Sequence, residues 1–111
     1  MPSVKLETSS LLTRDQEKLL ALRLSALCAE KFQKPESVVQ VRIQSGMTVS
    51  FGGAVGEDSA LVEFALVGRI PEGAKAALPA EVAEILAPFG VDAGRVFLRY
   101  LETDASAWGW N

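Results

Sequence analysis

Three stretches of the chain place apolar residues at every second position. Val4 and Leu6 do so close to the amino terminus, and residues 39–43 and 96–101 follow the same period. Successive side chains of an extended chain point to opposite faces, so this alternation is typical of a strand. We predict a strand at each of the three stretches, with Pro2 at the first position of the first one.

A fourth apolar run is nearly continuous. Residues 60–67 are apolar except for Glu63, and polar residues and Gly68 bound the run. It is too short for a good helix, and its continuous apolar character predicts a central strand buried on both faces. Four glycines within residues 46–56 predict a turn and a loop before it.

The first helical pattern lies between the first two predicted strands. Apolar residues recur every three or four positions through residues 20–28, and Thr13 is followed three places later by Gln16. The threonine and glutamine form a capping-box pattern, which marks the start of a helix. We predict a helix from about Arg14 to Phe32, ended by Pro35, because the residue before a proline avoids the helical region.

A second helical pattern follows the central run and ends near Pro88 and Gly90. Its apolar residues, spaced by three and four, are Val82, Ile85, Leu86 and Phe89. This spacing predicts an amphipathic helix. A proline inside a helix removes a hydrogen bond and costs about 3 kcal/mol, so we predict a break or a first helical turn at Pro79.

The predicted elements follow the order strand, helix, strand, loop, strand, helix, strand. This order describes two βαβ units and predicts an α+β fold in which two helices cover one face of a four-stranded mixed sheet. The other face would expose apolar strand residues unless a second subunit covered it, and large exposed apolar patches are rare on monomers. The pattern therefore favours an oligomer.

Composition and charge narrow the class of protein. The chain has 111 residues, 49% of them apolar and 23% charged, which fits one globular domain over residues 1–111. The net charge of −3 and the lack of a Lys/Arg block argue against a nucleic-acid partner. No stretch approaches the roughly 20 apolar residues that span a bilayer, so we expect no membrane partner.

The use of cysteine and histidine restricts the chemistry. Cys28 is the single cysteine, so no intrachain disulfide can form, and a reducing, cytoplasmic setting fits best. Histidine is absent, which removes the commonest general base and the usual catalytic triads. Any proton transfer must use another group, and we expect neither a metal nor another cofactor.

Six short segments become informative when they are taken together. They are MPSVKLETS at the start, KPESVVQVRI at residues 34–43, MTVSFGG at 47–53, ALVGRI at 65–70, GRVFLRY at 94–100 and GWN at 109–111. In this order and spacing they resemble the macrophage migration inhibitory factor family of the tautomerase superfamily. The resemblance implies a homotrimer whose three sheets enclose a central barrel, with an active site near each N-terminal proline at a subunit boundary.

The resemblance implies that Pro2 and Lys34 carry the chemistry. If Met1 is removed, Pro2 has a free secondary amine, and partial burial with a nearby cation would lower its pKa so that the neutral amine accepts a proton. Lys34 matches the family's active-site lysine, whose ammonium would bind a substrate carboxylate and help to keep the amine neutral. By themselves, a proline that starts a strand and a lysine that follows a helix are ordinary structural features.

The resemblance assigns five further residues to substrate binding, namely Val67, Phe97, Arg99, Trp108 and Trp110. Val67 matches an aliphatic pocket residue whose backbone N–H contacts substrate, and Trp110 matches a family tryptophan. Phe97 and Arg99 replace a tyrosine and an asparagine, and Trp108 replaces a smaller residue; these three are expected to shape the pocket from the adjacent chain. Arg99 offers either a bidentate fork for a carboxylate or a salt bridge across the trimer.

These observations predict a homotrimeric keto–enol tautomerase that acts on phenylpyruvate-like 2-keto acids. Two alternatives stay open on the same scaffold. In one, Pro2 is protonated and Arg99 aids water addition to an unsaturated acid, or its dehalogenation, which also needs an acidic partner to activate water. In the other, the chain is a non-enzymatic, cytokine-like binding protein.

Overall fold

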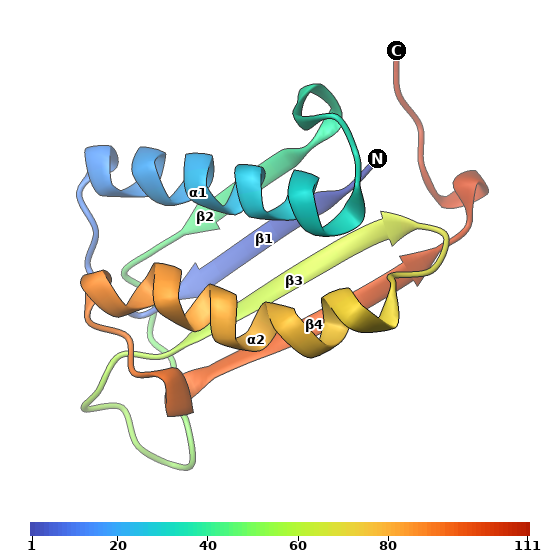
Figure 1. Ribbon diagram of the computed structural model, residues 1–111. Helices are drawn as coiled ribbons and strands as arrows, with labels where there is room; N and C mark the ends of the chain where they lie inside the picture. Colours follow the sequence, from blue (N-terminus) through green and yellow to red (C-terminus); the bar gives the residue numbers. More distant parts are fainter.

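A four-stranded mixed sheet forms one layer of the molecule, and two helices lie across one of its faces (Figure 1). The computed structural model describes residues 1–111. The strands are β1 (Ser3–Thr8), β2 (Gln40–Gln44), β3 (Ala60–Val67) and β4 (Val96–Thr103), and the helices are α1 (Arg14–Phe32) and α2 (Glu72–Leu86). The strand order is β2-β1-β3-β4; β1 runs parallel to β2, β3 runs parallel to β4, and β1 and β3 are antiparallel. The predicted α+β fold of two βαβ units is confirmed.

Helix α1 begins and ends where the sequence predicts. The side chain of Thr13 accepts the N–H of Gln16 at 3.1 Å, and the side chain of Gln16 accepts the N–H of Thr13 at 2.9 Å, which completes the capping box. At the other end Gln33 adopts a left-handed φ of 53° and donates its N–H to the carbonyls of Ala29 and Glu30. This residue turns the chain out of the helix toward β2.

Helix α2 runs through Pro79, so the predicted break or helix start at that residue is wrong. A proline at this position leaves the carbonyl of Lys75, four residues earlier, without its helical N–H partner. The hydroxyl of Tyr100 on β4 donates to that carbonyl at 3.1 Å. Phe89, predicted to belong to the helix, lies beyond it in a 3₁₀ turn. A hydrogen bond from β4 thus satisfies the helix carbonyl that Pro79 leaves without a partner.

The core lies between the sheet and the two helices. Phe64 of β3 is fully buried at its centre, and Phe32 of α1 packs against it edge-on with ring centroids 5.9 Å apart. The predicted apolar stripe of α1 is confirmed, because Leu20, Leu24 and Cys28 are all fully buried. Every second residue of β3, starting from Ala60, is buried against these helices.

The opposite face of the sheet is uncovered in the single chain, and it corrects the prediction that β3 is buried on both faces. The β3 residues that alternate with the core set are only half-buried, so this strand is not buried on both faces. A row of charged residues crosses the four strands in register, formed by Arg42, Lys5, Glu63 and Arg99. Apolar residues on this face lie on β3 and β4, where they include Leu61, Val67 and Phe97. The uncovered face is therefore mixed rather than apolar.

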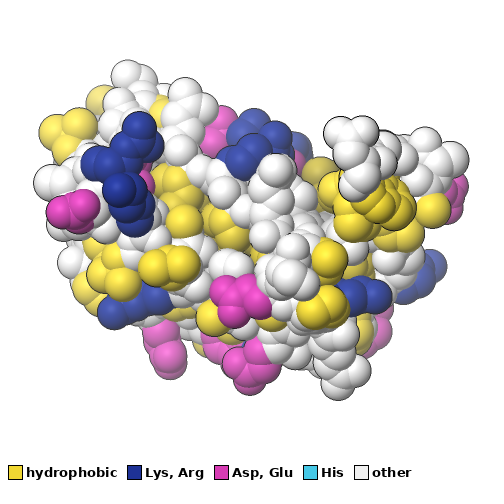
Figure 2. Space-filling model, turned by 90° about the horizontal axis from the view of Figure 1, so that it is seen from above, with side chains coloured by type: hydrophobic (Ala, Val, Ile, Leu, Met, Phe, Trp, Pro, Cys, Tyr) yellow, Lys and Arg dark blue, Asp and Glu magenta, His cyan; other side chains and the backbone are white.

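The face of the molecule seen in Figure 2 carries no broad patch of one charge. Figure 2 shows acidic, basic and apolar side chains in small groups over the face seen from above. No group of three or more His, Cys, Asp or Glu side chains is placed to hold a metal ion. Neither helix combines the length and the apolar character that a membrane crossing requires.

Candidate active site at the amino terminus

A hollow of about 460 Å³, here called the Pro2 hollow, lies beside the amino terminus. The start of β1, the turn between α1 and β2, and the tail after β4 form it. Its lining residues are Met1, Pro2, Ser3, Ser37, Val38, Val39, Gln40, Trp108, Gly109 and Trp110. The lining combines apolar side chains with hydroxyl and amide groups and contains no carboxylate side chain. Three segments distant in sequence therefore meet around Pro2.

Pro2 is held rigidly at the start of β1. Its side chain is less than 2% exposed, and its carbonyl accepts the N–H of Gln40 at 3.2 Å. Proline has no N–H to donate, and the first position of a strand is where this absence is tolerated best. The nitrogen of Pro2 thus lies at the end of a paired strand, where it is joined to Met1.

The phase of the sheet hydrogen bonds determines where the amide of Val67 points. The N–H of Ser9 donates to the carbonyl of Ser59 at 3.2 Å, so odd-numbered residues of β1 and β3 bond to each other. The N–H of Gly68 donates to the carbonyl of Thr103 at 2.8 Å, so even-numbered positions along β3 bond toward β4. The N–H of Val67 consequently points away from β4 and toward the β1 side.

The amide of Val67 lies just beyond the paired part of β1. The pairing of β1 with β3 ends with Ser3 opposite Ala65. In the same register Val67 lies opposite Met1, and it forms no hydrogen bond with that residue. Val67 therefore presents an amide donor toward the strand that follows Pro2, although Val67 is not among the residues that line the Pro2 hollow.

Lys34 follows the left-handed end of α1. Its N–H donates to the carbonyl of Ala29 at 3.1 Å, which fixes the backbone at this point. Its side chain is exposed and forms no ion pair. The lining of the Pro2 hollow begins slightly further along the chain, at Ser37. The ammonium of Lys34 is thus an uncommitted positive charge on the segment that leads into the hollow.

Trp108 is anchored in the Pro2 hollow by its indole. The Nε1–H donates to Oγ1 of Thr103 at 2.6 Å, and that hydroxyl donates to the carbonyl of Leu66 at 2.8 Å. The N–H of Trp108 donates to the carbonyl of Ala105 at 3.1 Å, within a 3₁₀ turn of the tail. The prediction placed Trp108 in the pocket of an adjacent chain, whereas the structure places it beside Pro2 of its own chain. Trp110 lines the same hollow at its rim and is 66% exposed.

Phe97 and Arg99 do not lie near Pro2 within one chain. Phe97 lies at the other end of the sheet, where its ring is 63% exposed and its centroid is 4.8 Å from that of Phe51. Arg99 lies on the uncovered face with its Nη2 2.7 Å from Oε2 of Glu63. The salt bridge considered for Arg99 across a trimer is therefore made within the chain.

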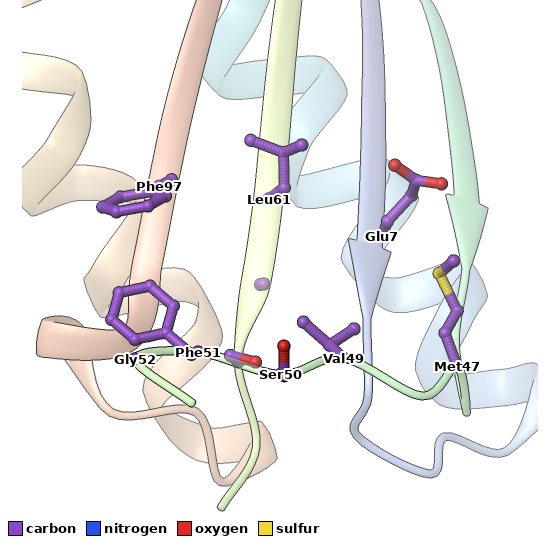
Figure 3. Close-up of a pocket in the computed structure, with 10 residues that line it drawn as sticks. Glu7, Met47, Val49, Ser50, Phe51, Gly52, Leu61 and Phe97 are labelled. Atoms are coloured by element: carbon purple, nitrogen blue, oxygen red, sulfur yellow. The ribbon is translucent and has the colours of Figure 1, made fainter. Parts of the chain in front are cut away.

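The end of the sheet near Phe97 has a hollow of its own, of about 450 Å³, here called the Phe97 hollow. Figure 3 shows the rings of Phe51 and Phe97 close together on one wall, with the side chains of Val49 and Met47 along the loop below the strands. The hydroxyl of Ser59, which also contributes to this lining, is buried without a hydrogen-bond partner. The lining is mainly apolar.

Cys28 does not contribute reactive sulfur to either hollow. Burial raises the pKa of its thiol to about 12, and the positive charge of the chain terminus opposes this only in part. The thiol therefore stays protonated at neutral pH and carries little nucleophilic thiolate. Cys28 is therefore a small residue of the core.

Sequence reasoning did not identify Thr103, Val38 or Val39 as residues of the site. The two valines fall in the KPESVVQVRI segment, which marks the region but not which of its side chains face Pro2. Thr103 follows the last predicted strand and carries no motif. Its importance arises from the register between β3 and β4, in which it lies opposite Val67.

Comparisons with known proteins agree on one family. Residues 1–111 match the model of the family described as Macrophage migration inhibitory factor (MIF). The fold is similar to the crystal structure of MIF2 from Leishmania major, with a TM-score of 0.89 and 23% identity over 100% of this chain and 94% of that one. It is also similar to the MIF homologue from Prochlorococcus marinus (TM-score 0.88, 24% identity, 98% and 95% coverage) and to the MIF-like protein from Entamoeba histolytica (0.90, 21%, 99% and 95%). No curated protein sequence matches the chain.

The match over the whole chain shows that this protein belongs to the macrophage migration inhibitory factor family, within the tautomerase superfamily. The structural neighbours share the same fold of a four-stranded mixed sheet with two helices. The resemblance drawn from the six sequence segments is thereby confirmed.

Proposed function

We propose that this chain is a cofactor-independent keto–enol tautomerase for phenylpyruvate-like 2-keto acids, with Pro2 as the group that moves the proton. The observation that carries the proposal is the buried Pro2 at the end of β1, in a hollow without any Asp, Glu, His or Lys side chain in its lining. Membership of the family supports an isomerase of this general kind. The nitrogen of Pro2 is then the best available base in the hollow.

The reaction requires that Met1 is removed. With Met1 present the nitrogen of Pro2 is an amide without basicity, whereas its removal leaves a secondary amine. From the keto form, this amine takes a proton from the carbon next to the carbonyl, a C=C bond forms, and the carbonyl becomes an enolate. The ammonium of Pro2 then returns the proton to the enolate oxygen, and the reverse steps convert enol to keto acid.

Two donors support the negative charge in this proposal. The N–H of Val67 points to the β1 side, and in this proposal it would hold the developing enolate or the substrate carboxylate. Lys34 brings an unpaired ammonium on the segment that leads into the hollow, suited to the carboxylate. Trp108 and Trp110 form the apolar wall for the side chain of the substrate.

The proposal includes a homotrimer in which Phe97 and Arg99 of one copy border the Pro2 hollow of the next. The exposed Phe97 and the uncovered sheet face support assembly. Because Glu63 already holds Arg99, a substrate carboxylate would have to compete with it, and we assign Arg99 mainly to the shape and charge of the pocket wall. Light scattering is expected to give three times the mass of the chain in solution. A single-chain mass would contradict this part of the proposal.

A covalent label tests the role of Pro2 directly. Incubation with 2-oxo-3-pentynoate, an electrophilic alkynyl keto acid, followed by peptide mass spectrometry, is expected to show loss of Met1 and one adduct at Pro2. Protein purified from cells that retains Met1, or labelling spread over lysines, would contradict the mechanism. The hydratase alternative gains no support, because no carboxylate lines the hollow to activate water. Correctly processed protein without turnover on a panel of keto acids would instead favour a binding role.

A further inference from the structure

Thr103 holds the peptide group that carries the amide of Val67. Its hydroxyl donates to the carbonyl oxygen of Leu66 at 2.8 Å. That oxygen and the N–H of Val67 belong to the same peptide bond, which is planar and nearly rigid. Because the two groups point in opposite directions, a hydrogen bond at the oxygen on the β4 side orients the N–H on the β1 side. The carbonyl of Thr103 also accepts the N–H of Gly68 at 2.8 Å, so the peptide groups on both sides of Val67 are held by one residue.

The same hydroxyl holds the wall of the Pro2 hollow. A threonine hydroxyl has one proton to donate and lone pairs to accept. Its proton goes to Leu66, and its oxygen accepts the indole N–H of Trp108 at 2.6 Å. Apart from this bond, the structure ties Trp108 to the protein by a backbone hydrogen bond to Ala105 within the short tail. The indole therefore depends on Thr103 for its orientation.

We propose that Thr103 is a positioning residue of the tautomerase site, which aims the amide of Val67 at the substrate oxygen and holds Trp108 as the wall that faces the substrate side chain. This inference rests on the proposed function. The two hydrogen bonds form a chain from the indole through the hydroxyl to the carbonyl of Leu66, and hydrogen bonds in a chain polarise and strengthen one another. The polarised peptide group then makes the N–H of Val67 a better donor. Neither effect requires Thr103 to touch the substrate.

Thr103→Val tests the proposal, because valine keeps the shape and removes both hydrogen bonds. An amide that stabilises the enolate acts mainly in the transition state, so its misplacement lowers kcat, whereas a loosened wall weakens binding and raises KM. We expect kcat to fall about tenfold, because the bond that orients the Val67 amide is lost. We expect KM to rise several-fold, because the bond that holds Trp108 is lost. Thr103→Ser keeps the hydroxyl and should restore both constants. Trp108→Phe removes the indole N–H and reduces the area of the aromatic wall but leaves the bond from Thr103 to Leu66 in place, so KM should rise while kcat stays near the wild-type value.

Thr8→Val is the matched control. Thr8 makes the same pattern of bonds at the other end of β1: its hydroxyl donates to the carbonyl of Ser59 at 2.8 Å and accepts the N–H of Ser10 at 3.2 Å. This variant should lower stability without changing kcat or KM. Equal kinetic constants for Thr103→Val and Thr8→Val would overturn the positioning role.

A second measurement separates the failure of this inference from the failure of the proposed function. In a Trp110→Phe background Trp108 is the only tryptophan. Thr103→Val should then make its fluorescence markedly easier to quench with acrylamide, and Thr8→Val should not. If the wild type does not convert keto acids, the proposed function fails. The quenching measurement still tests whether Thr103 positions Trp108, because it does not depend on activity. Unchanged quenching in Thr103→Val would overturn the positioning role.

Discussion

The two ends of the sheet carry hollows of nearly equal size, about 460 Å³ beside Pro2 and about 450 Å³ beside Phe97, but they differ in chemistry. The Pro2 hollow is lined by Met1 and Pro2, and the N–H of Val67 points toward the β1 side without a hydrogen bond to Met1. The Phe97 hollow contains paired aromatic rings and a glycine-containing loop. The two hollows are therefore similar in volume, but only the Pro2 hollow contains the proposed proton carrier.

Among these variants, Pro2→Gly should have the largest effect on activity. If it had no effect, the contrast between the two hollows would not hold. We expect kcat/KM for enol-to-keto conversion to fall by about 100-fold or more, the usual contribution of a positioned acid–base group. Absorbance of the enol gives the rate, and intact mass verifies loss of Met1. Pro71→Gly, an exposed proline before α2, is the control and should keep the wild-type rate. Wild-type turnover by Pro2→Gly would remove the distinction between the two ends.

Phe97→Ala tests whether the two hollows complete each other between copies. The ring is 63% exposed in the single chain, so the free energy of unfolding of the chain itself should change little. If the ring borders the Pro2 hollow of a neighbour, KM should rise about tenfold, as for truncation of an aromatic contact residue. Leu22→Ala on α1, 67% exposed, is the control. An unchanged KM and oligomer mass for Phe97→Ala would leave the Phe97 hollow without a role in catalysis.

Glu63→Gln probes the charged row that lies between the two ends. Arg99 donates from Nη2 and Nε to one carboxylate oxygen of Glu63, at 2.7 and 3.1 Å. Because the guanidinium is largely exposed, the variant should lower the free energy of unfolding by less than about 1 kcal/mol. Urea denaturation measures this, with Glu72→Gln as a control for an ion pair on α2. A loss of several kcal/mol would mean that the row is buried in the assembly.

Glu102 should make the Pro2 end of the sheet sensitive to acid. The N–H of Ile70, at 2.7 Å, and the ammonium of Lys75, at 3.2 Å, lower the pKa of this carboxyl group. A group whose pKa is lowered by folding stabilises the folded state above its unfolded pKa, and this stabilisation is lost as the pH falls through the folded pKa. The Tm of the wild type should therefore decrease more than that of Glu102→Gln between neutral pH and about pH 3. Asp92→Asn replaces an exposed acid without an ion pair, so its Tm should fall with pH as that of the wild type does. If the Tm of Glu102→Gln fell in parallel with that of the wild type, the stabilising role of the Glu102 carboxylate would be contradicted.

Local patterns were sufficient for the elements because helix and strand periods arise from the geometry of neighbouring residues. The capping box at Thr13 and the alternation around Val41 gave correct elements for this reason. The prediction at Pro79 was wrong because the partner that satisfies Lys75 is the hydroxyl of Tyr100, which belongs to a strand far along the chain. Likewise β3 was predicted to be buried on both faces, although no layer of the single chain covers its second face.

By itself, the sequence determined the order of elements, the family and the best candidate for a proton carrier, since a chain without histidine offers few bases and places Pro2 at the head of a strand. Only the tertiary structure decided which groups surround Pro2. It directed the amide of Val67 to the β1 side, placed Trp108 on the hydroxyl of Thr103, and left Phe97 at the opposite end of the sheet. These contacts depend on the register between strands that are far apart in sequence, and register is set by the hydrogen bonds of the assembled sheet rather than by any local pattern of residues.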